Sequence, residues 1–334
     1  MPDMVFAIAI IALALIFDFY NGMNDAANSI ATIVSTRVLK PIQAVAWAAF
    51  FNFAAVFIFG VSVANTIGKG IVDISIVDNA VISGGVIGAI LMSAIATHNG
   101  MPISISHAII GGYAGAGVAK AGFVAIVTSS FGKIVLFIFL APILGFIIAL
   151  IFSIATTWVV RNKKPSKVDK YFRRLQLISS AFFSLSHGSN DAQKTIGIIT
   201  VVLFTNGLIG NTFYVPDWVI FMSYSVISLG TLLGGWKVIS TLGMRVTKLT
   251  PFGGFSAETS AGLTISMASL LGIPVSTTHT ITGSIIGVGT MRGFSAVRWG
   301  VARNILWTWV LTIPLAGLFS AISYYIIAYI IKIV

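Results

Sequence analysis

Long apolar runs, interrupted by short clusters of polar residues, occupy most of the chain. A membrane-spanning helix needs about 20 mostly apolar residues, and backbone polar groups within lipid have to be satisfied inside the element. The pattern therefore predicts an all-α polytopic membrane protein in which some runs are too short to cross alone. The candidate runs cover residues 4–20, 26–39, 42–64, 80–97, 103–119, 131–160, 175–186, 195–210, 217–236, 255–272, 275–291 and 297–331.

Two of these runs, 131–160 and 297–331, are longer than one perpendicular crossing requires. Each contains a proline, Pro142 or Pro314, at which a bend or a division into two pieces is expected. The first run has no Lys or Arg before it and no small-residue cleavage pattern after it. We therefore interpret it as part of the mature protein and not as a signal peptide.

One sustained hydrophilic segment, residues 161–174, carries 7 of the 20 Lys and Arg residues. An excess of Lys and Arg in a short loop is typical of the cytoplasmic side of a membrane protein. We therefore divide the chain into a first transmembrane repeat over 1–160, a basic cytoplasmic linker over 161–174 and a second transmembrane repeat over 175–334. Binding of lipid headgroups is the lesser interpretation of the linker.

The composition changes the picture only by excluding other classes of protein. Hydrophobic residues make up 57% of the chain and charged residues 9%, whereas soluble domains carry about 25% charged residues. The net charge of +11 does not indicate nucleic-acid binding, because 7 of the 20 basic residues form one juxtamembrane cluster and the remainder are thinly spread. The chain has no cysteine, which excludes disulfides and thiolate metal sites.

Two polar motifs occur twice, in the same order and at nearly the same separation. NGMNDAANSI at residues 21–30 aligns with HGSNDAQKTI at 187–196, and MPISISHAIIG at 101–111 aligns with IPVSTTHTITG at 273–283. This self-similarity indicates a duplicated unit. If each unit crosses the membrane an odd number of times, the second is inverted relative to the first, and both termini lie outside when the linker is cytoplasmic.

The glycine, proline and polar residues of these motifs predict broken helices, which are tolerated in a bilayer where they are buried in protein or line a wet cavity. Pro102 and Pro274 suit the first turn of a helix. The hydroxyls that follow would join free backbone N–H groups in binding an oxyanion; helix capping or interhelical hydrogen bonding is the alternative. The predicted phosphate-binding residues are Ser104, Ser106, Ser276, Thr277 and Thr278.

Asp25 and Asp191 lie within apolar segments, where a carboxylate pairs with a cation or lines a pathway. Hard cations prefer oxygen ligands, so these acids and nearby amides predict sodium binding; a structural Asp that caps a broken helix is the alternative. Lys194 of the second motif aligns with Asn28 of the first. It is interpreted either as a built-in cation beside Asp191 or as a side chain that extends to the membrane interface. The predicted sodium ligands are Asn24, Asp25, Asn28, Asn190, Asp191, Gln193 and Glu258.

Glu258 is the only glutamate in the chain and heads an apolar stretch. It is interpreted as a third cation ligand, with a proton carrier or a buried hydrogen-bonding group as alternatives. His107 and His279 recur at matched positions. We expect them, like Lys194, to lie around the ligands and to orient the hydroxyl-rich turns, although a histidine can also titrate or bind a metal.

At these residues the chain resembles the inorganic phosphate transporter (PiT) family, in which each half carries a Gly-x-Asn-Asp motif. The resemblance covers both halves, including the Pro-x-Ser-x-x-His pair that begins at Pro102 and Pro274. It implies a phosphate symporter with an inverted repeat, re-entrant helical hairpins at the Pro-x-Ser segments, and a homodimer. The matching positions associated with transport in the family are Asp25, Asp191, Ser104, Ser276 and Glu258.

The chain also departs from the animal members of that family. They have acidic residues near Asn52 and Gly85, and Asn in place of Lys194. The Gln-Lys form is similar to microbial members, which are coupled either to sodium or to protons. The resemblance therefore leaves both driving ions open, and some relatives carry sulfate.

The predicted function is sodium-coupled symport of inorganic phosphate by alternating access in the plasma (inner) membrane. Phosphate, sodium and membrane lipid are the expected partners, with no covalent cofactor, because a doubly charged anion needs accompanying cations at low dielectric and no P-loop motif occurs. The alternatives are a proton-coupled phosphate or sulfate symporter, an anion channel, and an intramembrane hydrolase. The hydrolase would use Ser104 with His107 or Ser276 with His279, but a duplicated nucleophile has no evident purpose, so we predict that the protein is not an enzyme.

Overall fold

The computed structural model describes residues 2–239 and 246–333, and over these residues it is nearly all helical, as predicted. One isolated bridge joins Val72 to Ile126. The helices are α1 (Pro2–Ser35), α2 (Pro41–Ala54), η1 (Ala55–Phe57), α3 (Ser62–Gly70), α4 (Asn79–Asn99), α5 (Ile105–Ala121), η2 (Phe123–Ala125), α6 (Thr128–Val160), α7 (Pro165–Thr205), α8 (Asp217–Leu233), α10 (Pro251–Leu270), α11 (Thr277–Met291), η3 (Phe294–Ala296) and α12 (Trp299–Ile333).

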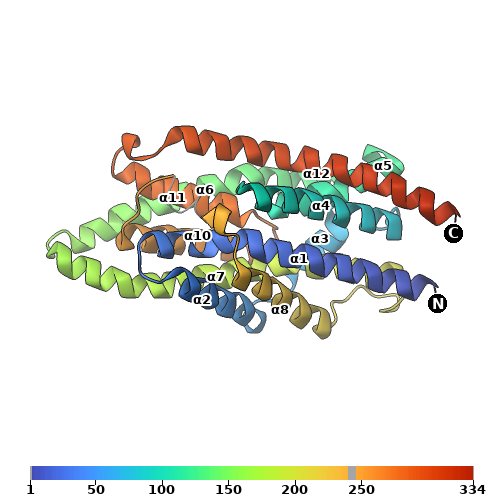
Figure 1. The fold of residues 1–334 in the computed structure, drawn as a ribbon, viewed down its shortest axis with the longest axis horizontal. Coiled ribbons are helices and arrows are strands. Elements are labelled where there is room, and N and C mark those ends of the chain that lie inside the picture. The colour runs from blue at the N-terminus through green and yellow to red at the C-terminus, as the bar shows by residue number, and fades with distance from the viewer. Residues whose placement is uncertain (1, 240–245, 334) are drawn as a thin grey trace.

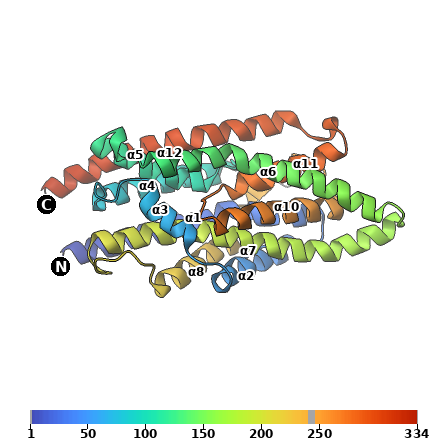
Figure 2. The same ribbon diagram turned by 180° about the vertical axis from the view of Figure 1, so that it is seen from behind.

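The helices form one elongated bundle whose two ends carry different parts of the chain. The start of α1 and the end of α12 lie at the same end, and the turn between α6 and α7 lies at the opposite end (Figures 1 and 2). The basic segment and the two termini are therefore separated by the length of the bundle.

Four helices of the described chain are long and apolar enough to cross a membrane: Met4–Ser35, Asn79–Asn99, Thr128–Val160 and Trp299–Lys332. The pair Pro41–Phe57 and Ser62–Gly70 also meets the test when taken together, although it is bent by 84°. Pro142 and Pro314 lie inside α6 and α12, each of which remains one helix.

Two helical hairpins approach the middle of the bundle from opposite ends. Hairpin α4–α5 occupies the half nearer the termini, and hairpin α10–α11 occupies the half nearer the α6–α7 turn (Figures 1 and 2). The predicted Pro-x-Ser interruptions are present as the non-helical residues 100–104 and 271–276 at the two tips.

The halves of the chain pack against each other reciprocally. Helix α12, at the end of the second half, packs on hairpin α4–α5 of the first, whereas α6 of the first half packs on α10 and α11 of the second. In the same way α8 packs on α1, and α2 packs on α7. Neither half is a separate domain, because each buries its apolar surface against the other.

The two Gly-x-Asn-Asp motifs do not interrupt their helices, contrary to the sequence prediction. Helix α1 is continuous over 34 residues and α7 over 41 residues. The motif glycines serve close packing instead: a Cβ on Gly22 would stand 2.0 Å from the Ile227 carbonyl oxygen, and one on Gly188 would stand 2.5 Å from that of Asn52.

The basic segment 161–174 is mostly helical, where the sequence suggested a linker. Only residues 161–164 lie outside the helices, and α7 begins at Pro165 in its first turn, where proline is favoured. Arg173 pairs with Asp169 one turn earlier at 2.9 Å, which supports the helix at this exposed end.

The hydrophobic core consists of two clusters with a polar band between them. On α1 one cluster ends at Phe17 and the other begins at Ala27, and on α7 they are bounded by Phe183 and Ala192. The buried residues in these intervals are largely polar. This band therefore brings the Asp25 and Asp191 motifs together in the middle of the bundle.

We expect Gly22→Ala and Gly188→Ala each to destabilise the protein by about 1–3 kcal/mol or more, because the added methyl group would overlap a backbone carbonyl. The measurement is thermal unfolding of the detergent-solubilised protein by intrinsic fluorescence. Gly132→Ala in α6 is the control, since nothing lies within 4 Å of its position, and alanine is a better helix former than glycine by roughly 1 kcal/mol. Equal melting temperatures for Gly22→Ala and the wild type would contradict the packing role.

Candidate functional site

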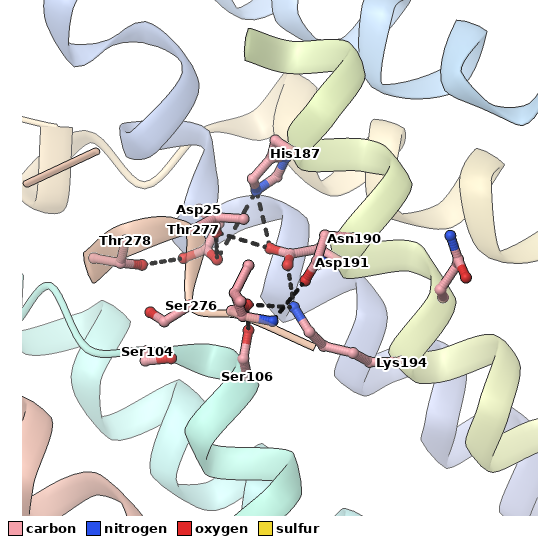
Figure 3. Close-up of polar contacts among 12 residues, drawn as sticks. Asp25, Ser104, Ser106, His187, Asn190, Asp191, Lys194, Ser276, Thr277 and Thr278 are labelled. Atoms are coloured by element: carbon pink, nitrogen blue, oxygen red, sulfur yellow. Dashed lines mark hydrogen bonds and ion pairs between the residues drawn. The ribbon is translucent and has the colours of Figure 1, made fainter. Parts of the chain in front are cut away.

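The two hairpin tips touch each other through matched hydrogen bonds. The Ser106 hydroxyl donates to the Val275 carbonyl oxygen at 3.3 Å, and the Thr278 hydroxyl donates to the Ile103 carbonyl oxygen at 3.2 Å. All four residues are buried. The two tips are therefore in direct contact inside the bundle (Figure 3).

Each tip begins a helix with a serine cap. Ser104 Oγ accepts from the His107 backbone N–H at the start of α5, and Ser276 Oγ accepts from the His279 N–H at the start of α11, both at 3.2 Å. A serine at this position satisfies one free N–H of the first turn and leaves others available. Two helix N-termini, which favour negative charge, thus converge on one place.

Asp25 from α1 and Asp191 from α7 face the second of these N-termini. The Thr277 hydroxyl lies 3.1 Å from Asp191 Oδ2 and 3.4 Å from Asp25 Oδ2, and the Thr278 hydroxyl lies 3.4 Å from Asp25 Oδ1. Asn28 donates to Thr278 Oγ1 at 2.9 Å. Two predicted anion ligands, Thr277 and Thr278, and three predicted cation ligands, Asp25, Asn28 and Asp191, are therefore parts of one buried cluster.

His187 lies between the two carboxylates and was not among the predicted site residues. Its Nε2 is 3.1 Å from Asp191 Oδ2 and 3.9 Å from Asp25 Oδ2, and Nδ1 contacts Asn52 Oδ1 at 3.1 Å. One ligand atom from each of Asp25, His187 and Asp191 lies within 4.8 Å of the others. The signal was its place as the first residue of the HGSND motif, one turn before Asp191.

Lys194 is buried in the same cluster and pairs with Asp191. Its ammonium group contacts Asp191 Oδ1 and lies 3.3 Å from the Val275 carbonyl oxygen, and the side chain is 1% exposed. The interpretation of Lys194 as a side chain that extends to the interface is therefore wrong, and its ammonium acts as a fixed positive charge in the site (Figure 3).

Three predicted sodium ligands hold the helices together. Asn24 donates to Thr97 Oγ1 at 2.8 Å, and Asn190 makes the matching bond to Ser269 Oγ at 2.9 Å. Gln193 faces away from Asp191, because its Oε1 accepts from the Val63 N–H at 2.8 Å at the start of α3. These contacts tie α1 and α7 to their neighbours.

Glu258 lies in a separate buried cluster. Its Oε1 accepts from Thr32 at 2.6 Å and from Gln176 Nε2 at 3.0 Å, and its Oε2 accepts from Ser179 at 2.5 Å. Thr32 follows Asp25 by seven residues on α1, which corresponds to roughly 10 Å along the helix axis. Glu258 therefore belongs to a second polar position, nearer the α6–α7 turn.

The rings of His107 and His279 contact each other, with centroids 4.4 Å apart and an interplanar angle of 86°. His279 also stacks on Trp309 at 3.6 Å. Ser104 and Ser276 accept hydrogen bonds from the backbone N–H groups of these two histidines and not from their rings. The pair thus packs the two tips together behind the hydroxyls.

Comparison with known proteins identifies the family. Residues 21–320 match the model described as the Phosphate transporter family. The chain belongs to this family. A probable low-affinity inorganic phosphate transporter of Rhizobium meliloti (strain 1021) is 52% identical over 318 residues, 95% of each chain. A protein of the same description from Bacillus subtilis (strain 168) is 41% identical over 326 residues, 97% of this chain and 98% of that one.

A solved structure described as the sodium-dependent phosphate transporter has the same fold. Its TM-score is 0.88 at 29% sequence identity, covering 98% of this chain and 100% of that chain. The family resemblance seen in the sequence is thereby confirmed. This member of the phosphate transporter family is a multi-pass membrane transporter of phosphate and not an enzyme, which excludes the Ser/His hydrolase.

We expect Lys194→Met to lower the stability of this phosphate transporter by about 3–5 kcal/mol, because it leaves a buried carboxylate without its ammonium partner. Asp191→Asn combined with Lys194→Met removes both charges and should recover much of that loss. The measurement is thermal unfolding in a sodium-free choline buffer. A double variant that melts no higher than Lys194→Met would show that the pair does not account for the effect.

Proposed function

We propose that this phosphate transporter is a sodium-coupled symporter of inorganic phosphate that works by alternating access. The observation that carries the proposal is the contact between the two hairpin tips beside Asp25 and Asp191. It places donors for an anion and acceptors for cations within one buried cluster. Burying a dianion alone costs tens of kcal/mol in the idealised Born limit, so anion and cations enter together.

The phosphate ligands are proposed to be the hydroxyls and free N–H groups at the starts of α5 and α11. Helix N-termini of this kind favour anions through their backbone donors and dipoles. In the structure the Thr277 hydroxyl points at the carboxylates and the Thr278 hydroxyl donates to the Ile103 carbonyl oxygen, so phosphate binding would redirect them. The proposed ligands are Ser104, Ser106, Ser276, Thr277 and Thr278.

Sodium is proposed to bind at the two motif carboxylates and at Glu258. Asp25 has the fewer competing partners, since its oxygens contact two hydroxyls at 3.4 Å, whereas Asp191 also contacts Lys194 and His187. The sodium dependence named for the similar solved structure supports this assignment. The proposal keeps four amide residues as groups that position the helices carrying these carboxylates: Asn24, Asn28, Asn190 and Gln193. Of these, Asn28 is linked to Asp25 through Thr278.

Alternating access is proposed to arise from two inverted repeats that rock against each other. Hydrogen bonds that recur within each half support the symmetry: Asn24 to Thr97 corresponds to Asn190 to Ser269, and the Ser104 cap corresponds to the Ser276 cap. The hairpins are proposed to be re-entrant, since each reaches only the middle of the bundle (Figure 1).

We propose an inner-membrane location with the α6–α7 turn in the cytoplasm and both termini outside. The Lys and Arg residues of 161–174 support this orientation, as does the position of the termini at the opposite end. Large exposed apolar side chains on α6 and α12, such as Phe139 and Leu318, support contact with lipid. A homodimer, which the family resemblance implies, is part of the same proposal.

Proton-coupled transport is the second candidate, because one positive charge is already built into the site. Lys194 neutralises Asp191 without an added ion, and Glu258 has a full set of hydrogen-bonding partners that suits a protonated carboxyl as well as a carboxylate. Sulfate, an oxyanion of similar shape, is the competing substrate.

The test is uptake of radiolabelled phosphate into proteoliposomes under an imposed sodium or proton gradient, with sulfate as competitor. We expect an inward sodium gradient to drive uptake and a proton gradient alone to give none. Asp25→Asn combined with Asp191→Asn should abolish uptake, because the cation ligands are lost. Uptake driven by protons alone would select the second candidate, and downhill flux that ignores both gradients would indicate a channel.

Separate Ser104→Ala and Ser276→Ala variants test the two-sided anion site in the same assay. Each should raise the phosphate KM, because each removes a hydroxyl and a cap worth about 1 kcal/mol from one helix N-terminus. Ser225→Ala is the matched control outside the cluster, because this exposed hydroxyl donates to the Phe221 carbonyl oxygen one turn earlier on α8. An unchanged KM in either serine variant would contradict a site formed from both tips.

A further inference from the structure

Asp18 is a buried acid that neither the repeated motifs nor the proposed transport site uses. It lies on α1 seven residues before Asp25, so both face the same side of the helix about 10 Å apart along its axis. The residue is 0% exposed. Both carboxylate oxygens lack a hydrogen-bond partner among the described residues.

Three neighbouring side chains share this lack of partners. Asn21 and Thr195 are the polar neighbours of the Asp18 carboxylate, and Tyr224 lies within range of its charge. Asn21 Oδ1, Thr195 Oγ1 and the Tyr224 hydroxyl are all buried without a hydrogen-bond partner in the described part of the chain. Helices α1 and α7 thus bring together four unpartnered oxygens of Asp18, Asn21 and Thr195, and α8 carries Tyr224 in their surroundings.

Buried polar groups in folded proteins are nearly always paired, and an unpaired buried charge is strongly unfavourable. The charged groups that influence Asp18 are Asp191 and Lys194 on α7. The ammonium of Lys194 is directed to Asp191 and to the Val275 carbonyl oxygen, so it does not pair with Asp18. The nearby Asp191 makes an unneutralised charge on Asp18 still less favourable.

We propose that Asp18, Asn21, Thr195 and Tyr224 form a binding site for sodium, on the side of the phosphate site nearer the termini. Carboxylate, amide and hydroxyl oxygens are the ligands that hard cations prefer. A single carboxylate among neutral oxygens matches a monovalent ion, since one positive charge leaves the site neutral. The inference rests on the proposed sodium-coupled function and extends it by one cation.

The asymmetry of the repeat explains why a cation is needed here. In the second repeat Lys194 stands where the first has Asn28, so Asp191 already holds a positive charge that belongs to the protein. A tethered ammonium cannot be carried across the membrane. The site at Asp18 would hold an exchangeable cation near the position where Lys194 supplies a permanent positive charge to Asp191.

The test counts radioactive sodium bound to the purified protein in detergent, without phosphate and in choline buffer. We expect Asp18→Asn to bind one sodium fewer per chain than the wild type. Thr195→Val and Tyr224→Phe should keep the count and weaken the affinity of one site roughly tenfold, equivalent to about 1.4 kcal/mol. Asp217→Asn, an exposed carboxylate on the helix that carries Tyr224, should bind sodium as the wild type does.

Thermal unfolding of the same samples separates a lost site from a misfolded protein. In sodium-free buffer Asp18→Asn should melt above the wild type, because the amide removes a buried unpaired charge. Added sodium stabilises the state that binds it, so it should raise the melting temperature of the variant less than that of the wild type. A variant that melts below the wild type without sodium would overturn the proposal.

The site would also be overturned if Asp18→Asn bound as many sodium ions per chain as the wild type, with the same affinity. A protonated, uncharged Asp18 would then explain why this side chain is buried. Displacement of the ion by an equal concentration of potassium would overturn the assignment to sodium. Phosphate uptake is measured separately. If the wild type shows sodium-driven uptake but Asp18→Asn binds as many sodium ions as the wild type, the site at Asp18 is refuted and the proposed function stands. If Asp18→Asn binds one sodium fewer but the wild type shows no sodium-driven uptake, the site stands and the proposed function is refuted.

Discussion

The contact between the two hairpin tips is the constraint on which the rest of the structure depends. Each tip ends in non-helical backbone, and such backbone is tolerated inside a bilayer only where protein or a polar cavity satisfies it. Here each tip supplies a hydroxyl to a carbonyl oxygen of the other, Ser106 to Val275 and Thr278 to Ile103. The proposed anion site therefore lies where the two halves meet.

The reciprocal packing of the helices encloses that meeting point. Helix α6 of the first half packs on α10 and α11 of the second, and α12 of the second half packs on α4 and α5 of the first. Gly22 and Gly188 let α1 and α7 approach α8 and α2 closely enough for backbone contact. Between the two apolar clusters this leaves a band in which buried acids, amides and hydroxyls are held by helices on every side.

The long apolar runs were enough to predict the helical class. The duplicated motifs predicted the family and the residues at the tips, because proline, serine and an intramembrane acid each have few structural uses. The prediction of unwound helices at Asp25 and Asp191 was wrong, because glycine permits close packing as well as a break and the sequence does not distinguish these uses. The contacts of Gln193, His187 and Asp18 could not be predicted either. They depend on which helix faces which, and only tertiary packing decides that.

Helix α1 presents Asp18, Asp25 and Thr32 at intervals of seven residues, the last in contact with Glu258. A seven-residue interval is close to two full turns and drifts by only about 20°, so these oxygens form a nearly straight stripe along an unbroken helix. A helix without a break acts as a rigid spacer, so the backbone fixes the separation of these oxygen groups at about 10 Å per interval. Any movement of α1 as a whole would therefore displace all three positions together.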